Sequence, residues 1–117
     1  MKNMLTVAAM AVVIGLSGQA QAQFQGPTIA PVSVADAKKL SDDTAVILVG
    51  NIEKNLGGEK YLFRDKTDSV TLDIDNDKWN GVTITPSDTI EIRGEVDTHW
   101  RKPTDIDVDS VNISLKN

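Results

Sequence analysis

The sequence predicts an all-β domain with a short N-terminal helix, its five strands closed into a small barrel. Apolar residues recur with a period of two in separate stretches after residue 44, the pattern of half-buried strands. The first stretch is long and apolar on both faces, with Gly50 in its middle, where a strand can bend sharply. Closure into a barrel removes the exposed edges that an open sheet of this size would have.

Length and composition exclude several classes of protein. A chain of 117 residues has room for one hydrophobic core, so two independently folding domains are excluded. The absence of Cys excludes a disulfide scaffold, thiol chemistry and Cys-ligated metals. A net charge of −5 argues against nucleic-acid binding, because phosphate recognition requires clustered Lys and Arg.

Residues 1–22 have the features of a secretory signal peptide. The apolar stretch Met4–Leu16 follows Lys2 and is too short for a membrane span, which takes about 20 residues. Ala20-Gln21-Ala22 supplies the small-x-small cleavage pattern. We therefore predict cleavage after Ala22, a periplasmic location without membrane insertion, and an extended leader over residues 23–32. An uncleaved anchor is the alternative.

The folded domain is predicted over residues 33–117 and begins with a helix over Val34–Leu40. Ser33 has the side chain of an N-cap, and Asp36 follows it by three residues as an acidic variant of the capping box. Val34, Ala37 and Leu40 fall on one face of this helix. The first strand is predicted over Ala45–Asn55, with a glycine-containing hairpin connection after it.

Four more strands follow, predicted from the same alternation: Lys60–Arg64, Ser69–Asp75, Thr89–Asp97 and Asp105–Leu115. The residues from Asn76 onward are rich in turn formers, and a single helical turn is expected before Trp79. In the last strand the apolar set shifts parity between Val108 and Val111, which requires a β-bulge at Asp109-Ser110.

Short motifs occur in a fixed order from Phe24 to Ile113. They are Phe24-Gln25-Gly26-Pro27, Asp42-Asp43-Thr44, Val46-x-Leu48-x-Gly50-x-Ile52, Tyr61-x-Phe63-x-Asp65, Asp73-Ile74-Asp75, Trp79-x-Gly81, Pro86-x-Asp88, Gly94-Glu95-Val96-Asp97 and Ile106-Asp107-Val108. This ordered set resembles the periplasmic bacterial OB-fold (BOF) family of stress-tolerance proteins. Ser69 and Asp105 depart from the family pattern, which usually has Gly and Glu there.

The resemblance implies an OB-type barrel, export to the periplasm and a role in surviving envelope stress. It implies binding rather than catalysis. The family has no agreed ligand or catalytic residue, so the resemblance assigns no site residue to this chain.

Acidic residues alternate along two predicted strands: Asp73, Asp75 and Asp77, then Asp105, Asp107 and Asp109. The calcium-loop template starts in the same way but then requires Gly and Glu, where this chain has Lys78 and Ile84. An EF-hand is therefore excluded. Three interpretations remain open: a solvated face of two strands, a looser cation site and an electrostatic surface for cationic ligands.

The aromatic residues bear on nucleic-acid binding. OB-folds that bind single strands stack bases on aromatic side chains within a basic groove. Here the outward positions of the third and fourth strands are mostly acidic, so that face repels phosphate. Trp79 is predicted to plug one barrel end rather than to stack a ligand. Trp100, in a loop, is either a ligand contact or a packing residue.

Catalysis has little support in the sequence. His99 is the only His, and no spacing places it with a Ser and an acid, so we expect a solvated loop residue that could titrate in an acidified periplasm. The chain contains no glycine-rich phosphate loop and no HExxH. We predict neither enzymatic activity nor a cofactor.

These observations predict a periplasmic, non-catalytic binding module that contributes to envelope stress tolerance. Its expected partner is an envelope protein or a cationic or amphipathic ligand, and not a nucleic acid. The predicted ligand surface comprises acidic outward residues with two aromatic residues at the rim: Asp73, Asp75, Glu91 and Glu95, with Tyr61 and Trp100. A single-stranded nucleic-acid-binding OB-fold protein and a secreted hydrolase are the alternatives.

Overall fold

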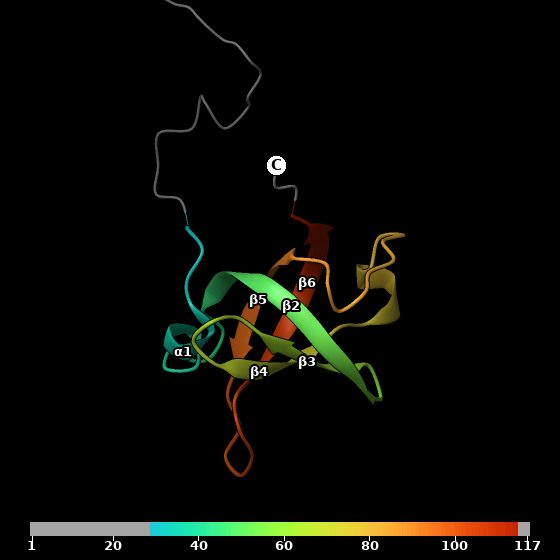
Figure 1. The fold of residues 1–117 in the computed structure, drawn as a ribbon. Coiled ribbons are helices and arrows are strands. Elements are labelled where there is room, and N and C mark those ends of the chain that lie inside the picture. The colour runs from blue at the N-terminus through green and yellow to red at the C-terminus, as the bar shows by residue number, and fades with distance from the viewer. Residues whose placement is uncertain (1–28, 115–117) are drawn as a thin grey trace, which may run out of the picture.

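A computed structural model describes residues 29–114, which form a closed five-stranded barrel (Figure 1). The strands are β2 (Ala45–Gly57), β3 (Lys60–Arg64), β4 (Ser69–Asp73), β5 (Ile90–Asp97) and β6 (Asp105–Ile113). Their order around the barrel is β2-β3-β4-β6-β5. Neighbouring strands are antiparallel except for β4 and β6, which run parallel. The five predicted strands and their closure are confirmed.

Two predicted segments lie wholly or partly outside the described residues. The signal peptide, residues 1–22, and residues 23–28 of the leader belong to that part of the chain. The end of the leader is described and lies against the barrel, where Pro31 forms a parallel bridge with Ile47 and the N–H of Val32 donates to the carbonyl of Ile47. Within residues 29–114, no helix is long and apolar enough to cross a membrane.

β2 is long because it pairs with two different strands. Its first half, Ala45–Gly50, pairs with β5, and its second half pairs with β3 from Asn51 onward. Gly50 lies at the change of partner, where an added Cβ would meet the backbone carbonyl of Arg64. Such close backbone approach is possible only for glycine at this position.

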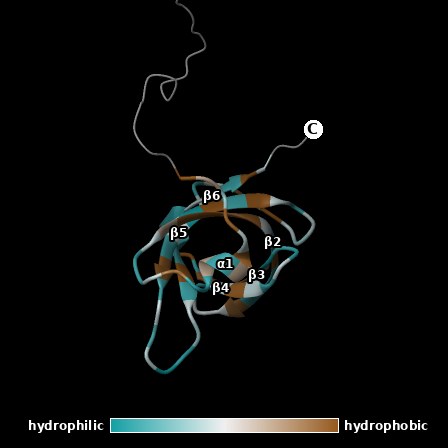
Figure 2. Cartoon of the chain, turned by 90° about the vertical axis from the view of Figure 1, so that its left-hand side faces the viewer, coloured by the Kyte–Doolittle hydropathy of each residue, from teal (hydrophilic) through white to brown (hydrophobic). Residues whose placement is uncertain are grey.

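The inward side chains of all five strands form one buried core. The helix α1 (Val34–Ala37) closes one end of it with Val34 and Ala37, both fully buried. Figure 2 looks onto this end, and α1 lies across the opening of the barrel. The N-cap assigned to Ser33 is confirmed, since its side chain accepts a hydrogen bond from the N–H of Asp36.

Several element ends differ from the prediction. α1 ends at Ala37 rather than Leu40, because Leu40 N–H bonds the carbonyl of Ala37 in a tighter turn. β4 ends at Asp73 rather than Asp75, because Ile74 N–H leaves the ladder to bond the carbonyl of Glu59. β2 extends through the predicted hairpin connection to Gly57, and the turn that follows contains Glu59 at positive φ.

The segment between β4 and β5 and the last strand follow the sequence closely. A single turn of 3-10 helix, η4 (Asn76–Lys78), leads to Trp79 as expected. In β6, Ser110 pairs with Arg93 and Val108 with Gly94, so Asp109 is the extra residue of the predicted bulge. β6 ends at Ile113, and the prediction that it continued to Leu115 reaches residues outside the described part.

Candidate functional site

The outer surface of the barrel carries a row of carboxylates across three adjacent strands. Asp73 on β4 is the partner of Asp107 on β6, and Asp107 is the partner of Glu95 on β5. The residues that flank them in sequence are buried in the core, so these three side chains point outward. Directly opposed side chains on adjacent strands lie close together, and like charges there repel. We call Asp73, Asp107 and Glu95 the acidic row.

Lys60 supplies a counter-charge at one end of this row. It is the partner of Asp73 on β3, and its ammonium nitrogen lies 2.9 Å from Asp73 Oδ2. The hydrogen bond to Asp73 raises the pKa of Lys60, against the opposing effect of desolvation. Glu95, at the other end, faces Ala45 on β2, so its neighbour on that side carries no charge.

Asp107, in the middle of the row, has a perturbed carboxyl group. Partial burial raises its pKa above the ordinary value, and the nearby charges of Asp73, Asp109 and Asp75 act in the same direction. Desolvation is the larger cause, and the accumulation of negative charge on this side of the barrel adds to it. A cation placed over the row would relieve this repulsion.

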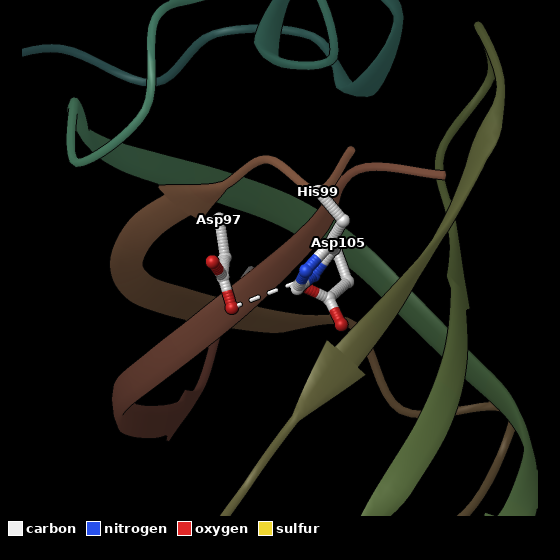
Figure 3. Close-up of side chains that lie close together, drawn as sticks. All are labelled: Asp97, His99 and Asp105. Carbon is white, nitrogen blue, oxygen red and sulfur yellow. Dashed lines mark hydrogen bonds and ion pairs between the residues drawn. The ribbon is translucent and has the colours of Figure 1, made fainter. Parts of the chain in front are cut away.

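A second group of polar side chains lies where β5 ends and β6 begins (Figure 3). Asp97 and Asp105 are partners across the β5–β6 ladder, and His99 folds back from the connecting loop. His99 Nε2 lies 3.0 Å from Asp105 Oδ1 and 3.6 Å from Asp97 Oδ2. We call these three residues the Asp-His-Asp cluster.

The environment of His99 contradicts the expectation of a solvated loop residue. Its side chain is only 23% exposed, because it packs between the two carboxylates. Asp105 is buried, with 6% of its surface exposed. The spacing of the sequence contained a signal for this cluster, because pairing the predicted strands in register places Asp97 opposite Asp105, with His99 in the loop between them.

The structure brings together some of the predicted ligand residues and separates others. Asp73 and Glu95 join the acidic row, and Asp75 lies beside Asp73 in a group that also contains Glu59. Glu91 lies four positions from Glu95 along β5 and pairs with Arg93, at 3.4 Å, away from the row. Asp107, at the centre of the row, is absent from the predicted ligand surface.

The aromatic residues have different surroundings. Tyr61 and Trp79 pack edge to face, with ring centroids 5.3 Å apart, and both contact the core. Trp79 therefore has a packing role, and Tyr61 packs with it rather than beside the acidic row. Trp100 is 87% exposed in the β5–β6 loop, with the guanidinium of Arg101 over its ring. Of the two alternatives predicted for Trp100, the packing residue is therefore wrong.

A groove of about 1030 Å³ runs along the outside of β2. Several of its polar side chains already bond within the protein. Arg64 Nε lies 3.1 Å from Glu53, and Asn51 Nδ2 donates to the carbonyl oxygens of Pro86 and Asp88.

Comparison with solved structures supports the fold. YgiW from Escherichia coli superposes with a TM-score of 0.71 at 44% identity, covering 78% of this chain and 97% of that one. The telomere capping protein Ten1 from Schizosaccharomyces pombe superposes with a TM-score of 0.58, but at 16% identity, over 74% of this chain and 81% of that one. The likeness to Ten1 shows a shared fold alone.

Sequence comparison places the chain in a family. Protein YgiW from Escherichia coli K12 is 44% identical over 102 residues, which cover 83% of this chain and 78% of YgiW. The calcium-regulated OB-fold protein CarO from Pseudomonas aeruginosa is 34% identical over 94 residues, covering 79% of this chain and 80% of CarO. The family model for bacterial OB fold (BOF) proteins matches residues 15–113. The chain therefore belongs to the bacterial OB fold (BOF) family.

Proposed function

We propose that this protein is a non-catalytic binding module of the bacterial envelope, which holds a cationic or amphipathic ligand on its acidic row. One observation carries the proposal. Asp73, Asp107 and Glu95 stand side by side on three adjacent strands, with Lys60 as the counter-charge at one end. A surface of this kind attracts positive charge and repels phosphate.

The periplasmic location and the role in stress tolerance complete the proposal. They are supported by the signal-peptide features of residues 1–22 and by membership of the family. Envelope stress brings cationic species to the periplasm, and an acidic barrel face provides a surface that such species can bind.

A binding role suits the chemistry of the site better than hydrolysis does. The groups of the acidic row are hydrogen-bond acceptors on an open face. His99 Nε2 faces Asp105 and Asp97, so this nitrogen is directed at carboxylates and not at a hydroxyl nucleophile. Nucleic-acid binding is the weaker candidate, because the acidic row repels a phosphate backbone.

Peptide titration tests the proposed ligand class. The probe is a Lys-rich amphipathic peptide carrying a fluorophore, titrated with the exported protein at increasing salt. We expect binding that weakens as salt rises, because exposed ion pairs are screened. Replacing Asp107 by Asn and Glu95 by Gln together should weaken binding about tenfold, since each exposed pair is worth about 0–1 kcal/mol.

A matched double variant locates the site. Asp36→Asn with Glu91→Gln removes the same charge from α1 and from the far part of β5, and it should weaken binding less. Equal losses in the two variants would show that net charge, rather than the acidic row, attracts the peptide. Tight binding of a single-stranded oligonucleotide at physiological salt, with no peptide binding, would favour the nucleic-acid alternative.

The stress role has a separate test in cells. A strain without the gene should be more sensitive to cationic antimicrobial peptides, and the unaltered gene should restore survival. The row variant should fail to restore survival although it accumulates to the normal level in the periplasm. Full restoration by this variant would separate the stress role from the acidic row.

A further inference from the structure

The Asp-His-Asp cluster has the donor spacing of a metal site. One nitrogen and two carboxylate oxygens from Asp97, His99 and Asp105 all lie within 4.8 Å of one another. His99 Nε2 is 3.0 Å from one oxygen and 3.6 Å from the other. Around tetrahedral zinc with bonds of about 2.0–2.1 Å, neighbouring donor atoms lie about 3.3–3.4 Å apart. The two measured distances lie on either side of this value, so small side-chain shifts would complete the geometry.

The burial of Asp105 is a second observation that favours a cation in this cluster. Its side chain is only 8% exposed. Oδ1 faces His99, whereas the nearest cationic nitrogen to Oδ2 is Lys60 Nζ at 3.8 Å, beyond hydrogen-bond distance. Among the described residues, no hydrogen-bond donor reaches Oδ2. A buried carboxylate is costly unless its charge is balanced, and Lys60, on the Oδ2 side, is already hydrogen-bonded to Asp73. A cation at Oδ1 would supply the balancing charge.

The pairing of the strands adds to this cost. Asp97 and Asp105 are directly opposed across the β5–β6 ladder, so the fold holds two like charges on one face. The β5–β6 ladder fixes both backbones, so it keeps the two carboxyl groups near each other. A divalent cation between them would balance both charges.

We propose that Asp97, His99 and Asp105 form a site for Zn²⁺. An imidazole nitrogen with carboxylate oxygens suits zinc, whereas calcium and magnesium prefer oxygen ligands alone. Two carboxylates neutralise the ion. The partial exposure of His99 leaves one side of the cluster open to solvent, so water takes the remaining coordination position.

Lys60 acts as a positioning residue for this site. Its ammonium group lies on the Oδ2 side of Asp105, which leaves Oδ1 directed at His99. The Lys60 charge is compensated by Asp73, whose Oδ2 lies 2.9 Å from Nζ. Ion pairs and hydrogen bonds from neighbouring residues to the metal-ligating side chains keep these ligands in position.

The composition of the chain makes the site easy to test. The full sequence contains one His and no Cys, so zinc binding through a nitrogen side chain must use His99. The experiment uses untagged exported protein and titrates Zn²⁺ at pH 7 by calorimetry, with Ca²⁺ and Mg²⁺ in parallel. We expect one Zn²⁺ per chain with a micromolar or lower dissociation constant, and binding of Ca²⁺ and Mg²⁺ at least a hundredfold weaker.

Nitrogen NMR of the single imidazole reports the ligand directly. Zinc should shift the Nε2 resonance of His99, and a chelator should reverse the shift. If both ring nitrogens stay protonated at pH 7 and neither moves with zinc, the cluster is an internal ion pair and the proposal is wrong.

Two matched variants distinguish zinc coordination by the cluster from attraction of Zn²⁺ by the protein's net negative charge. Asp97→Asn should weaken zinc binding at least tenfold; Asp97 is preferred to Asp105 because its side chain is 46% exposed and its replacement leaves the core intact. Asp109→Asn removes the same charge from the exposed bulge residue of β6 and should change the dissociation constant less than threefold. Equal weakening by both variants would overturn the proposal.

Discussion

The carboxylate of Asp65, in the loop between β3 and β4, accepts a 2.9 Å hydrogen bond from the backbone N–H of Val34 at the start of α1. In the same loop, Thr67 Oγ1 accepts from the N–H of Ala35. Together with Ser33, which accepts from Asp36, these residues satisfy the free N–H groups of the first helical turn. The helix that closes the barrel is thus held by a loop more than thirty residues further along the chain.

This relationship predicts a pH-dependent stability. Burial raises the pKa of Asp65, but the hydrogen bonds from Thr67, Val34 and Asp68 outweigh it and leave the pKa below its ordinary value. A lowered folded-state pKa contributes stability at neutral pH, and this contribution is lost as pH falls below about 4, through the folded-state value. Replacing Asp65 by Asn should therefore cost about 1 kcal/mol at pH 7, the size of a lost helix cap.

Urea midpoints measured at pH 7 and pH 3 check this prediction. The difference between the natural protein and Asp65→Asn should shrink at the lower pH. Asp36→Asn, an exposed change on the same helix, is the control and should have a small effect at both. A constant difference for Asp65→Asn would mean that its charge is not involved.

Gly50→Val should destabilise the barrel more than Gly57→Ala. A side chain on Gly50 would meet the carbonyl of Arg64 and the ring of Phe63, and the backbone atom cannot move aside. We expect a cost of about 2–3 kcal/mol for this overpacking. Gly57 has open space around it but a φ of +89°, so its replacement should cost about 1 kcal/mol. Equal denaturation midpoints would contradict the close crossing of β2 and β3.

Truncation of the two tryptophans should affect stability to different extents. Trp79→Ala removes the edge-to-face contact with Tyr61 and part of the core packing, at a cost of about 2 kcal/mol. Trp100→Ala should change stability by less than about 0.5 kcal/mol, because the ring is exposed. Thermal unfolding of the two variants provides the measurement. A large loss for Trp100→Ala would show that its ring packs on the domain.

Export should remove the segment that ends at Ala22. The reason is the Ala20-Gln21-Ala22 pattern after the apolar stretch Met4–Leu16. Intact-mass measurement of the periplasmic protein should give a chain that begins at Gln23 or its cyclised form. A product that retains Met4–Leu16 would make the protein an anchored one.

Local patterns in the sequence predict most of the barrel. Alternation locates all five strands, and the parity shift around Asp109 locates the bulge, because both follow from the two-residue period of a strand. The end of β4 is not predictable in this way. Ile74 continues the alternation, but its N–H bonds Glu59, a contact that depends on how the hairpin folds.

The candidate sites depend on strand order, which alternation does not specify. Asp73 and Glu95 are predicted as ligand residues from their outward positions, but β6 lies between their strands. Asp107 therefore becomes the middle member of the acidic row. The surroundings of His99 arise in the same way from the pairing of Asp97 with Asp105. A loop residue acquires its neighbours only when the strands on either side of it are aligned.

The parallel contact between β4 and β6 is the shortest ladder of the described barrel, with Thr71, Leu72 and Asp73 facing Asp105, Ile106 and Asp107. Short ladders open first in local fluctuations, so amide hydrogens along this contact should exchange with solvent faster than those of the long β5–β6 ladder. Repulsion between Asp73 and Asp107 favours the same opening. A cation bound between Asp73 and Asp107 would stabilise the β4–β6 pairing. Slower amide hydrogen exchange at this contact would then report binding, even for a ligand that neither absorbs visible light nor fluoresces.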